Sequence, residues 1–518
     1  MLIRDRLDVL FGDEAFVGLY PSDGRLGLSP GQLALVSVLQ FAENLSDRAA
    51  ADAVRTRIDW KYALGLELED PGFDHSVLCE FRARLAEQDG AADRLLQLML
   101  DRLVEAGLLK AGGRQRTDAT HVLAAVRTLS RLELVGETLR AALEELAEAA
   151  PAWLTPLIEP EWAKRYGRRV EIGKLPGGKA AVTARAEEFG RDGQKVLTAA
   201  WAACTLPHLR LLPHVEILRQ VWVHHYYWDA DGCLRWRDGH ALSPASLRFD
   251  SPYDTDAHYC VKRDTALSGY RTHFTETCDE ERPGLVVHVA TTISTVQDIE
   301  LTDSIHDMLA ERQLLPSEHV VDCGYISPAR IERAQRVHGI TLLGPVVADH
   351  SSQAKAGSGF GKAAFTIDWA ICPRGATSVS WTELRMKGNT YLQARFAEAD
   401  CRSCPAHTQC TSSATRPRSV AVLPRPLHEI QTRNRLEQQT EQWQRSYAIH
   451  AGIEATLSRR TSGPTGCDVP ATAAWPAPTS STSSPRWPAT SPASHWIDTT
   501  PRTRRRATHF RTLCSATV

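Results

Sequence analysis

Three acidic residues stand where the surrounding sequence predicts strand ends or one face of a helix. Asp118 lies in the Thr- and Val-rich stretch RQRTDATHVLAAV, Asp322 ends the buried-strand pattern EHVVD, and Glu454 lies in the amphipathic stretch YAIHAGIEATLS. Mg²⁺ prefers carboxylate oxygens, so carboxylates that converge from separate segments can hold two ions beside a scissile phosphate. The three residues therefore fit a two-metal phosphoryl-transfer site. Each could instead be a cap, a turn residue or a solvated charge, because the chain contains 62 acidic residues.

Cysteines in the second half of the chain have the spacing of a metal-binding segment. The two-residue spacing in CRSC lets one tight turn present both sulfurs to Zn²⁺, and a closed four-ligand site would be structural, not catalytic. The alternative is a set of reduced thiols. Cys323 follows Asp322 with no base beside it and is interpreted as a buried thiol. The candidate zinc ligands are Cys372, Cys401, Cys404 and Cys410.

Residues 161–179, EWAKRYGRRVEIGKLPGGK, interleave basic side chains with aromatic residues and glycine. Such a pattern can grip a phosphate backbone, although a solvated charged face is at least as common. The whole chain has a formal net charge of −2, so nucleic-acid binding would have to come from local patches of this kind. The candidate DNA contacts in this stretch are Lys164, Arg165, Arg168 and Arg169.

The elements that would carry these residues differ along the chain. Residues 1 to about 110 have the pattern of short helices, with Ser29, Ser46 and Asp74 as expected N-caps. Short helices with tight connections predict either a helix-turn-helix DNA module or an ordinary helical packing domain. From about residue 251 strand patterns alternate with helical ones, which implies a central sheet with helices packed on it.

Three further elements are expected. A leucine stripe from Leu129 to Leu146 predicts a long amphipathic helix, and residues 428–460 predict one long polar helix that carries Glu454. The stretch WVHHYYW (222–228) is interpreted as a strand, in which His224 and His225 would point to opposite faces. This arrangement argues against a metal site at the histidine pair.

Several motifs, in order along the chain, resemble a DDE transposase of a bacterial insertion sequence. They are TDATHVLAAVRTLSRLELVGETLR, SPYDTDAHYCVKRDT, VVDCGYISPARIERA, CRSCPAHTQCT and YAIHAGIEATLS. The resemblance implies an α/β fold with an RNase H-like mixed sheet and flanking helices, plus an all-α N-terminal domain. In it, Asp118 matches the family's first Asp, Asp322 the second, and Glu454 the third carboxylate.

The resemblance also implies an activity. Two Mg²⁺ ions would serve cleavage by water at the ends of the element, after which the freed 3′-OH attacks target DNA. DNA and a second copy of the chain in a synaptic homodimer are the implied partners. Two alternatives stay open: a non-catalytic DNA-binding remnant of a transposase, and an RNase H-like nuclease without strand transfer.

Around the third carboxylate the sequence departs from the family pattern. Tyr447 is present, but His450 stands where the family has Arg and Thr461 where it has a basic residue; Tyr447 and His450 are retained as candidate DNA contacts. After Ser458 the chain is rich in Pro, Ser and Thr, which indicates a disordered linker. Because three Trp interrupt this stretch, a frameshift near Ser458 with a return to frame near Arg504 is the second interpretation.

The resulting plan assigns a function to each part of the chain. No window approaches 18 uninterrupted apolar residues and no signal-peptide pattern opens the chain, so a cytoplasmic, nucleoid-associated protein without a membrane partner is expected. The expected parts are a helical DNA-binding domain (1–110), a catalytic core (111–345) with a helical, basic insertion at about 127–250, a Cys-bearing insertion (346–425), a closing helix (426–458), and a disordered or frameshifted tail (459–518).

Overall fold

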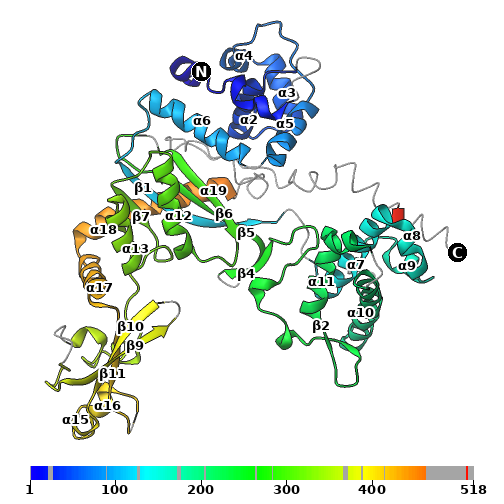
Figure 1. The fold of residues 1–518 in the computed structure, drawn as a ribbon. Coiled ribbons are helices and arrows are strands. Elements are labelled where there is room, and N and C mark those ends of the chain that lie inside the picture. The colour runs from blue at the N-terminus through cyan, green and yellow to red at the C-terminus, as the bar shows by residue number, and fades with distance from the viewer. Residues whose placement is uncertain are drawn as a thin grey trace.

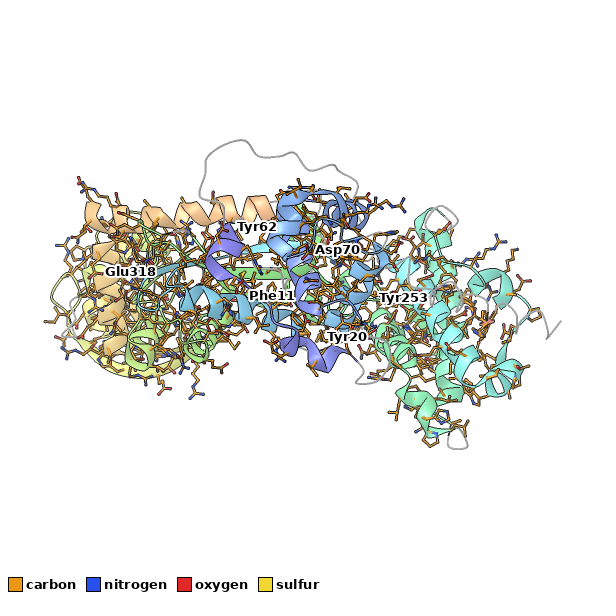
Figure 2. All side chains as sticks on the ribbon, turned by 90° about the horizontal axis from the view of Figure 1, so that it is seen from above. Phe11, Tyr20, Tyr62, Asp70, Tyr253 and Glu318 are labelled. Atoms are coloured by element: carbon orange, nitrogen blue, oxygen red, sulfur yellow. The ribbon has the colours of Figure 1, made fainter. Side chains whose placement is uncertain are left out.

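A central sheet lies between a group of N-terminal helices, a helical insertion and a smaller sheet (Figure 1). Seen from above, the labelled Phe11 and Tyr20 of the N-terminal helices lie between Glu318 on one side and Tyr253 on the other (Figure 2). This computed structural model describes residues 2–20, 27–88, 90–124, 129–171, 177–202, 206–262, 265–282, 284–365, 371–386, 389–413, 415–461 and 509–510. Within these residues no helix has the length and apolar character to cross a bilayer.

Short helices make up the N-terminal part, as predicted. Ser29 and Ser46 cap the helices that begin at Pro30 and Asp47, since each hydroxyl accepts a backbone N–H three residues further on. The predicted cap at Asp74 is displaced, because the helix begins at Ser76 and the Asp74 carboxylate accepts the Ser76 N–H (2.9 Å) in the preceding turn. The helices are α1 (Leu2–Leu7), η1 (Asp13–Leu19), α2 (Pro30–Glu43), α3 (Asp47–Thr56), α4 (Ile58–Leu64), α5 (Ser76–Glu87) and α6 (Ala91–Glu105).

The central sheet is mixed, which confirms the predicted α/β class. Strand β1 runs antiparallel to β5 on one side and parallel to β7 on the other, and β8 follows β7 in parallel. The far edge of β5 is shared, because β4 pairs with its first residues and β6 with the remainder. The strands are β1 (Arg114–Leu123), β4 (His258–Lys262), β5 (Thr265–Thr277), β6 (Val286–Ile293), β7 (Glu318–Val321) and β8 (Thr341–Leu343).

Helices connect these strands and close the sheet. The prediction of one polar helix over 428–460 was wrong, because the Thr440 hydroxyl accepts the Trp443 N–H (3.3 Å) and starts a new helix, and a 3-10 turn at Ile449–Ala451 interrupts the chain again. The helices are α12 (Asp298–Glu311), α13 (Pro328–Arg333) with a further π turn (Ala334–His338), α17 (Arg425–Glu437), α18 (Glu441–Ala448) and α19 (Gly452–Thr461).

Residues 124–257, between β1 and β4, form what we call the helical insertion. Its first helix follows the predicted leucine stripe and begins with a capping box of Ser130 and Glu133. The strand predicted over 222–228 was wrong in its first half, since the helix runs to His225 with Val221 and Trp222 in its buried face. The elements are α7 (Arg131–Ala149), α8 (Pro151–Leu154), α9 (Trp162–Tyr166), α10 (Lys179–Ala200), α11 (Pro213–His225), β2 (Tyr226–Trp228) and β3 (Leu234–Trp236).

Residues 346–425, which we call the Cys-bearing segment, contain a separate antiparallel sheet. Its strand order is β11, β10, β9, so the middle strand pairs with both others. Short helices flank this sheet before and after the central hairpin. The elements are α14 (Ser352–Lys355), β9 (Ser378–Met386), β10 (Asn389–Phe396), α15 (Glu398–Arg402), α16 (His407–Cys410) and β11 (Ser419–Val422).

Two apolar cores hold the molecule together. The larger joins the N-terminal helices, the central sheet and α12, and it takes in Ile453 and Leu457 of α19. The second lies within the helical insertion and includes the fully buried Phe510. The His509 N–H also donates to the Glu144 carboxylate (3.3 Å). Residues 509–510 therefore return to the helical insertion, whereas residues 462–508 and 511–518 of the predicted tail lie outside the described part of the chain.

Candidate active site at the edge of the central sheet

The register of β1 and β7 brings Asp118 and Asp322 side by side. The last residues paired between these parallel strands are Thr117 and Val321, so the two aspartates occupy the next step on each strand. Adjacent strands lie about 4.8 Å apart, and side chains at the same step point to the same face. Each carboxylate is partly buried and accepts one nearby backbone N–H at 2.7 Å. The arrangement therefore offers two oriented oxygen donors at one sheet edge.

A further carboxylate, Asp298, approaches the same edge and was missed by the sequence analysis. A Cβ placed on Gly324 would lie 2.8 Å from an Asp298 oxygen and 2.9 Å from an Asp322 oxygen, so the two carboxylates flank this glycine. Asp298 opens α12 and forms an ion pair with Arg271 (2.6 Å). An acidic residue in the first turn of a helix is common, so its type and position gave no signal.

A buried Tyr–His pair lies among these carboxylates. The Tyr325 hydroxyl and His273 Nδ1 are 2.5 Å apart. Burial, followed by the charges of Asp298, Asp118 and Asp322, holds the pKa of Tyr325 well above its usual value. Burial lowers the pKa of His273 to about 4. Both side chains are therefore neutral near pH 7 and place no positive charge that would compete with a cation for the carboxylates.

Glu454 is carried by α19, which a buried ion pair fastens to the sheet. Arg116 of β1 pairs with the fully buried Glu276 of β5 (2.5 Å) and also donates to a backbone carbonyl in the turn before α19. The Thr456 hydroxyl donates to the same glutamate (2.8 Å). At Gly452 a Cβ would lie 2.1 Å from the Arg116 guanidinium, so the helix approaches the strand closely at this residue.

The structure does not bring Glu454 together with the two aspartates. Its side chain is exposed, while Ile453 beside it is fully buried in the larger core. Among the residues described, no group of three His, Cys, Asp or Glu side chains is arranged to hold a metal ion. The donor chemistry of Asp118 and Asp322 fits a hard cation such as Mg²⁺. Of the three predicted metal-binding carboxylates, the structure therefore brings together Asp118 and Asp322.

Aromatic rings link the closing helices to the aspartate pair. Trp443, Tyr447 and His450 stack in a row, with ring centroids 4.8 and 5.4 Å apart and interplanar angles of 16° and 7°. Burial, followed by the charge of Asp322 as the largest of the nearby charges, raises the pKa of Tyr447 to about 12. The hydroxyl of Tyr447 therefore lies within electrostatic reach of the sheet edge.

His450 and Cys323 have different surroundings from those expected. His450 is only 9 % exposed, and its Nε2 is 3.2 Å from the carbonyl of Thr117, so little of the ring faces solvent for DNA contact. Cys323 is exposed, so its interpretation as a buried thiol was wrong. Partial burial and the charge of Asp322 raise its pKa, which disfavours the reactive thiolate.

The predicted basic patch lies at and after α9 in the helical insertion. The Arg165 guanidinium forms ion pairs with Glu188 (2.5 Å) and Asp192 (2.7 Å), so its charge is already engaged within the insertion. The aromatic residues of the motif, Trp162 and Tyr166, are buried and pack against each other instead of facing a ligand. Among the described residues of the stretch 161–179, the exposed basic residues are Lys164, Arg168, Arg169 and Lys179.

The four predicted zinc ligands meet at one cavity of about 340 Å³ in the Cys-bearing segment. They are Cys372, Cys401, Cys404 and Cys410, and all four are free thiols. Residues of the Cys-bearing segment line this cavity, and the small sheet of that segment lies apart from β1 and β7 (Figure 1). Any metal bound there would be separate from the candidate active site.

Two parts of the chain match known protein families. Residues 2–84 match the family described as Transposase domain (DUF772), and residues 371–465 match the family described as Transposase DDE domain. The second match contains Glu454 and ends at residue 465, shortly after Ser458, where the sequence analysis places the change in sequence character. No curated protein and no solved structure gives a significant match. The two matches, with the RNase H-like fold that the DDE domain indicates, are consistent with a DDE transposase of the insertion-sequence type.

Proposed function

We propose that this transposase cleaves DNA at the ends of its insertion sequence and joins them to target DNA, using Asp118, Asp322 and Glu454 as metal-binding carboxylates. The observation that carries the proposal is the register of β1 and β7, which sets Asp118 beside Asp322 at one sheet edge. A bound pair of Mg²⁺ ions would supply an activated oxygen nucleophile and stabilise the leaving oxygen.

The protein's own groups have distinct parts in this proposal. Asp118 and Asp322 provide the preformed oxygen donors, each oriented by a backbone N–H. Neutral Tyr325 and His273 keep the negative charge of the edge available for cations. In this proposal, Glu454 joins the two aspartates when DNA binds. Its carboxylate is exposed, and the helix that carries it is held on β1 through the ion pair of Arg116 and Glu276.

DNA binding is proposed for two further surfaces. The N-terminal helices, which match a transposase domain, would recognise the ends of the element. Exposed basic side chains of the helical insertion and the half-buried Tyr447 would contact phosphates. Assembly of a homodimer on paired ends and a cytoplasmic, nucleoid-associated location belong to the same proposal. The basic residues concerned are Lys164, Arg168 and Arg169.

A frameshift in the tail remains part of the proposal as a cause of lost activity. Phe510 is buried in the core of the helical insertion, and this favours a native sequence close to the C-terminus. The nucleotide sequence decides the question: a frameshift requires that codons 459–500 encode a helical, apolar segment in another frame. If they do not, the Pro-rich stretch is native.

The catalytic proposal is tested by Mg²⁺-dependent nicking of DNA that carries the ends of the element. We expect Asp322→Asn to lower the nicking rate roughly 10³-fold, because losing several kcal/mol of charge stabilisation costs about tenfold per 1.36 kcal/mol. Glu454→Gln should have a comparable effect if the helix completes the site. Glu281→Gln, an exposed carboxylate in the loop after β5, is the matched control and should retain full activity.

Two rival functions predict different results in the same assay. A non-catalytic remnant would bind end-containing DNA equally in the parent protein and in Asp322→Asn, without nicking in either. A nuclease without strand transfer would nick the DNA but give no joined product when target DNA is added. Nicking by the parent, loss in Asp322→Asn and formation of joined product together would support the transposase.

A further inference from the structure

The Cys-bearing segment has little apolar core of its own. Its fully or nearly buried apolar side chains are few, and among the described residues of the segment only Val346, at its first position, belongs to either of the two large apolar clusters. Units of this size rarely bury enough apolar surface to be stable alone, and they commonly depend on metals or disulfides. The buried apolar residues of the segment are Phe360, Ala394, Phe396, Ala406, Val420 and Leu423, together with Val346 at its junction with the larger core.

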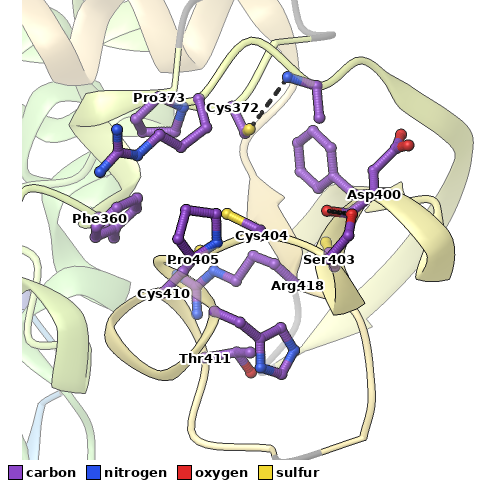
Figure 3. Close-up of a pocket in the computed structure, with 15 residues that line it drawn as sticks. Phe360, Cys372, Pro373, Asp400, Ser403, Cys404, Pro405, Cys410, Thr411 and Arg418 are labelled. Atoms are coloured by element: carbon purple, nitrogen blue, oxygen red, sulfur yellow. Dashed lines mark hydrogen bonds between the residues drawn. The ribbon is translucent and has the colours of Figure 1, made fainter.

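Four thiols reach the same cavity from three separate pieces of this segment. Cys372 lies in the turn before β9, Cys401 in α15 with Cys404 just after it, and Cys410 at the end of α16 (Figure 3). The thiols are therefore neighbours within one small volume.

The turn around Cys372 is shaped to direct a hydrogen-bond donor at sulfur. The Ala376 N–H donates to Cys372 Sγ (3.3 Å), and the Gly375 N–H donates to the Cys372 carbonyl (2.8 Å). Gly375 has a φ of +85°, a conformation that side chains other than glycine rarely adopt. Backbone donors to sulfur stabilise a thiolate, which is the form that binds metal.

A cationic side chain in the same cavity has one buried donor that is not used. Arg418 lines the cavity, and its Nε is buried without a hydrogen-bond partner among the residues described. A buried N–H without a partner is costly, so such a group usually marks a missing acceptor. A thiolate would satisfy this donor, and the guanidinium would offset part of the negative charge of several thiolates.

From the convergence of four thiols, the donor directed at sulfur and the unpaired Arg418 Nε, we propose that Cys372, Cys401, Cys404 and Cys410 bind one structural Zn²⁺. Four protons leave to solvent as four Zn–S bonds form, and no position stays open for substrate. As described, no three of these side chains lie close enough to hold an ion. Zinc binding would draw the turn before β9 and the helices α15 and α16 together, and the bound ion would cross-link these three parts of the segment.

The test measures the metal content of the full-length protein purified under reducing conditions. We expect about one Zn²⁺ per chain, and a Co²⁺-substituted sample with the intense charge-transfer absorption of thiolate ligands. Cys410→Ser should lose most of the bound zinc, whereas Cys410→His, which keeps a ligand, should retain it. Cys233→Ser, an exposed cysteine in the helical insertion, is the matched control and should leave zinc content unchanged.

Chelation provides a second measurement that does not depend on variants that fold poorly. Removal of zinc from the parent protein should abolish hydrogen-exchange protection in β9, β10 and β11 and leave α7 and α10 protected. Absence of zinc from the parent, Co²⁺ spectra without thiolate absorption, or disulfide bonds among the four cysteines would each overturn the proposal. The same holds if all four single Cys→Ser variants retain zinc.

Discussion

The sheet edge and the closing helix position their carboxylates by different means. Asp118 and Asp322 are fixed by the hydrogen-bond ladder of two parallel strands, in which a slip of one residue would turn every side chain to the other face. Glu454 lies on α19, and this helix is held by one buried ion pair, one hydroxyl and two apolar side chains. The pair at the edge is therefore preformed, whereas the third carboxylate depends on how the helix is docked.

This difference explains why only two of the three predicted ligands meet. Every step of the ladder adds backbone hydrogen bonds that specify the register, so the aspartates have little freedom. A docked helix can shift or rotate when a few side-chain contacts change. Replacing the residues that hold α19 therefore tests whether this helix must move to complete the site or is already in its final position.

The largest effect on stability is expected when Arg116 is replaced. Arg116→Met leaves Glu276, which is fully buried, without its ion-pair partner, and removing one member of a buried pair costs about 3–5 kcal/mol. It also removes the donor that holds the turn before α19. We expect the free energy of unfolding, measured by chemical denaturation, to fall by this amount, with α19 losing hydrogen-exchange protection first.

A double variant is the control for this prediction. Arg116→Met combined with Glu276→Met removes both charges, so most of the lost stability should return. If the single variant is as stable as the parent, the ion pair is not buried in solution and the docking of α19 must rest on its apolar contacts. In that case Ile453 would be the next residue to replace.

A smaller effect is expected at Thr456. Thr456→Val keeps the shape of the side chain but removes the hydroxyl that donates to Glu276 (2.8 Å). A hydrogen bond to a buried carboxylate contributes roughly 1.5–3 kcal/mol, and Arg116 still pairs with Glu276, so a loss near the lower value is expected. Thr456→Ser, which keeps the donor, should be closer to the parent. Equal stability of the Val and Ser variants would contradict this role of the hydroxyl.

The same contrast accounts for what the sequence could and could not predict. Ser29 and Ser46 marked helix starts correctly because capping is a local interaction. The aspartates were found through strand patterns and through resemblance to a family. The stretch 428–460 was taken for one helix because its polar spacing is continuous and the cap at Thr440 gives only a weak local signal.

Contacts between distant segments left no signal in the sequence. Asp298 resembles any acidic residue at a helix start, and only the position of Gly324 shows that it adjoins Asp322. The exposure of Cys323 likewise depends on the loop after β7 and not on its apolar neighbours in the chain. Arg165 could not be separated from the exposed basic residues of its motif, since its partners Glu188 and Asp192 come from the next helix.

The smallest effect at neutral pH, and the last test of the contrast, concerns buried histidines of the sheet and of α12, the helix packed on it. Burial lowers the pKa of His273, His288 and His306 to about 4 each. In the unfolded chain a histidine binds its proton near pH 6.5, so between about pH 6.5 and pH 4 the unfolded state holds more protons. Stability should be fully present above pH 6.5 and should fall as the pH is lowered through this window.

His288→Leu isolates one of these groups. The His288 Nδ1 has no hydrogen-bond partner among the described residues, so at pH 7 the variant should match the parent or exceed it by up to about 1 kcal/mol. Between pH 6.5 and 4 its unfolding free energy should fall less steeply, since one fewer proton is taken up on unfolding. Denaturation curves at several pH values measure both effects. Identical slopes for parent and variant would mean that His288 is solvated in the folded protein.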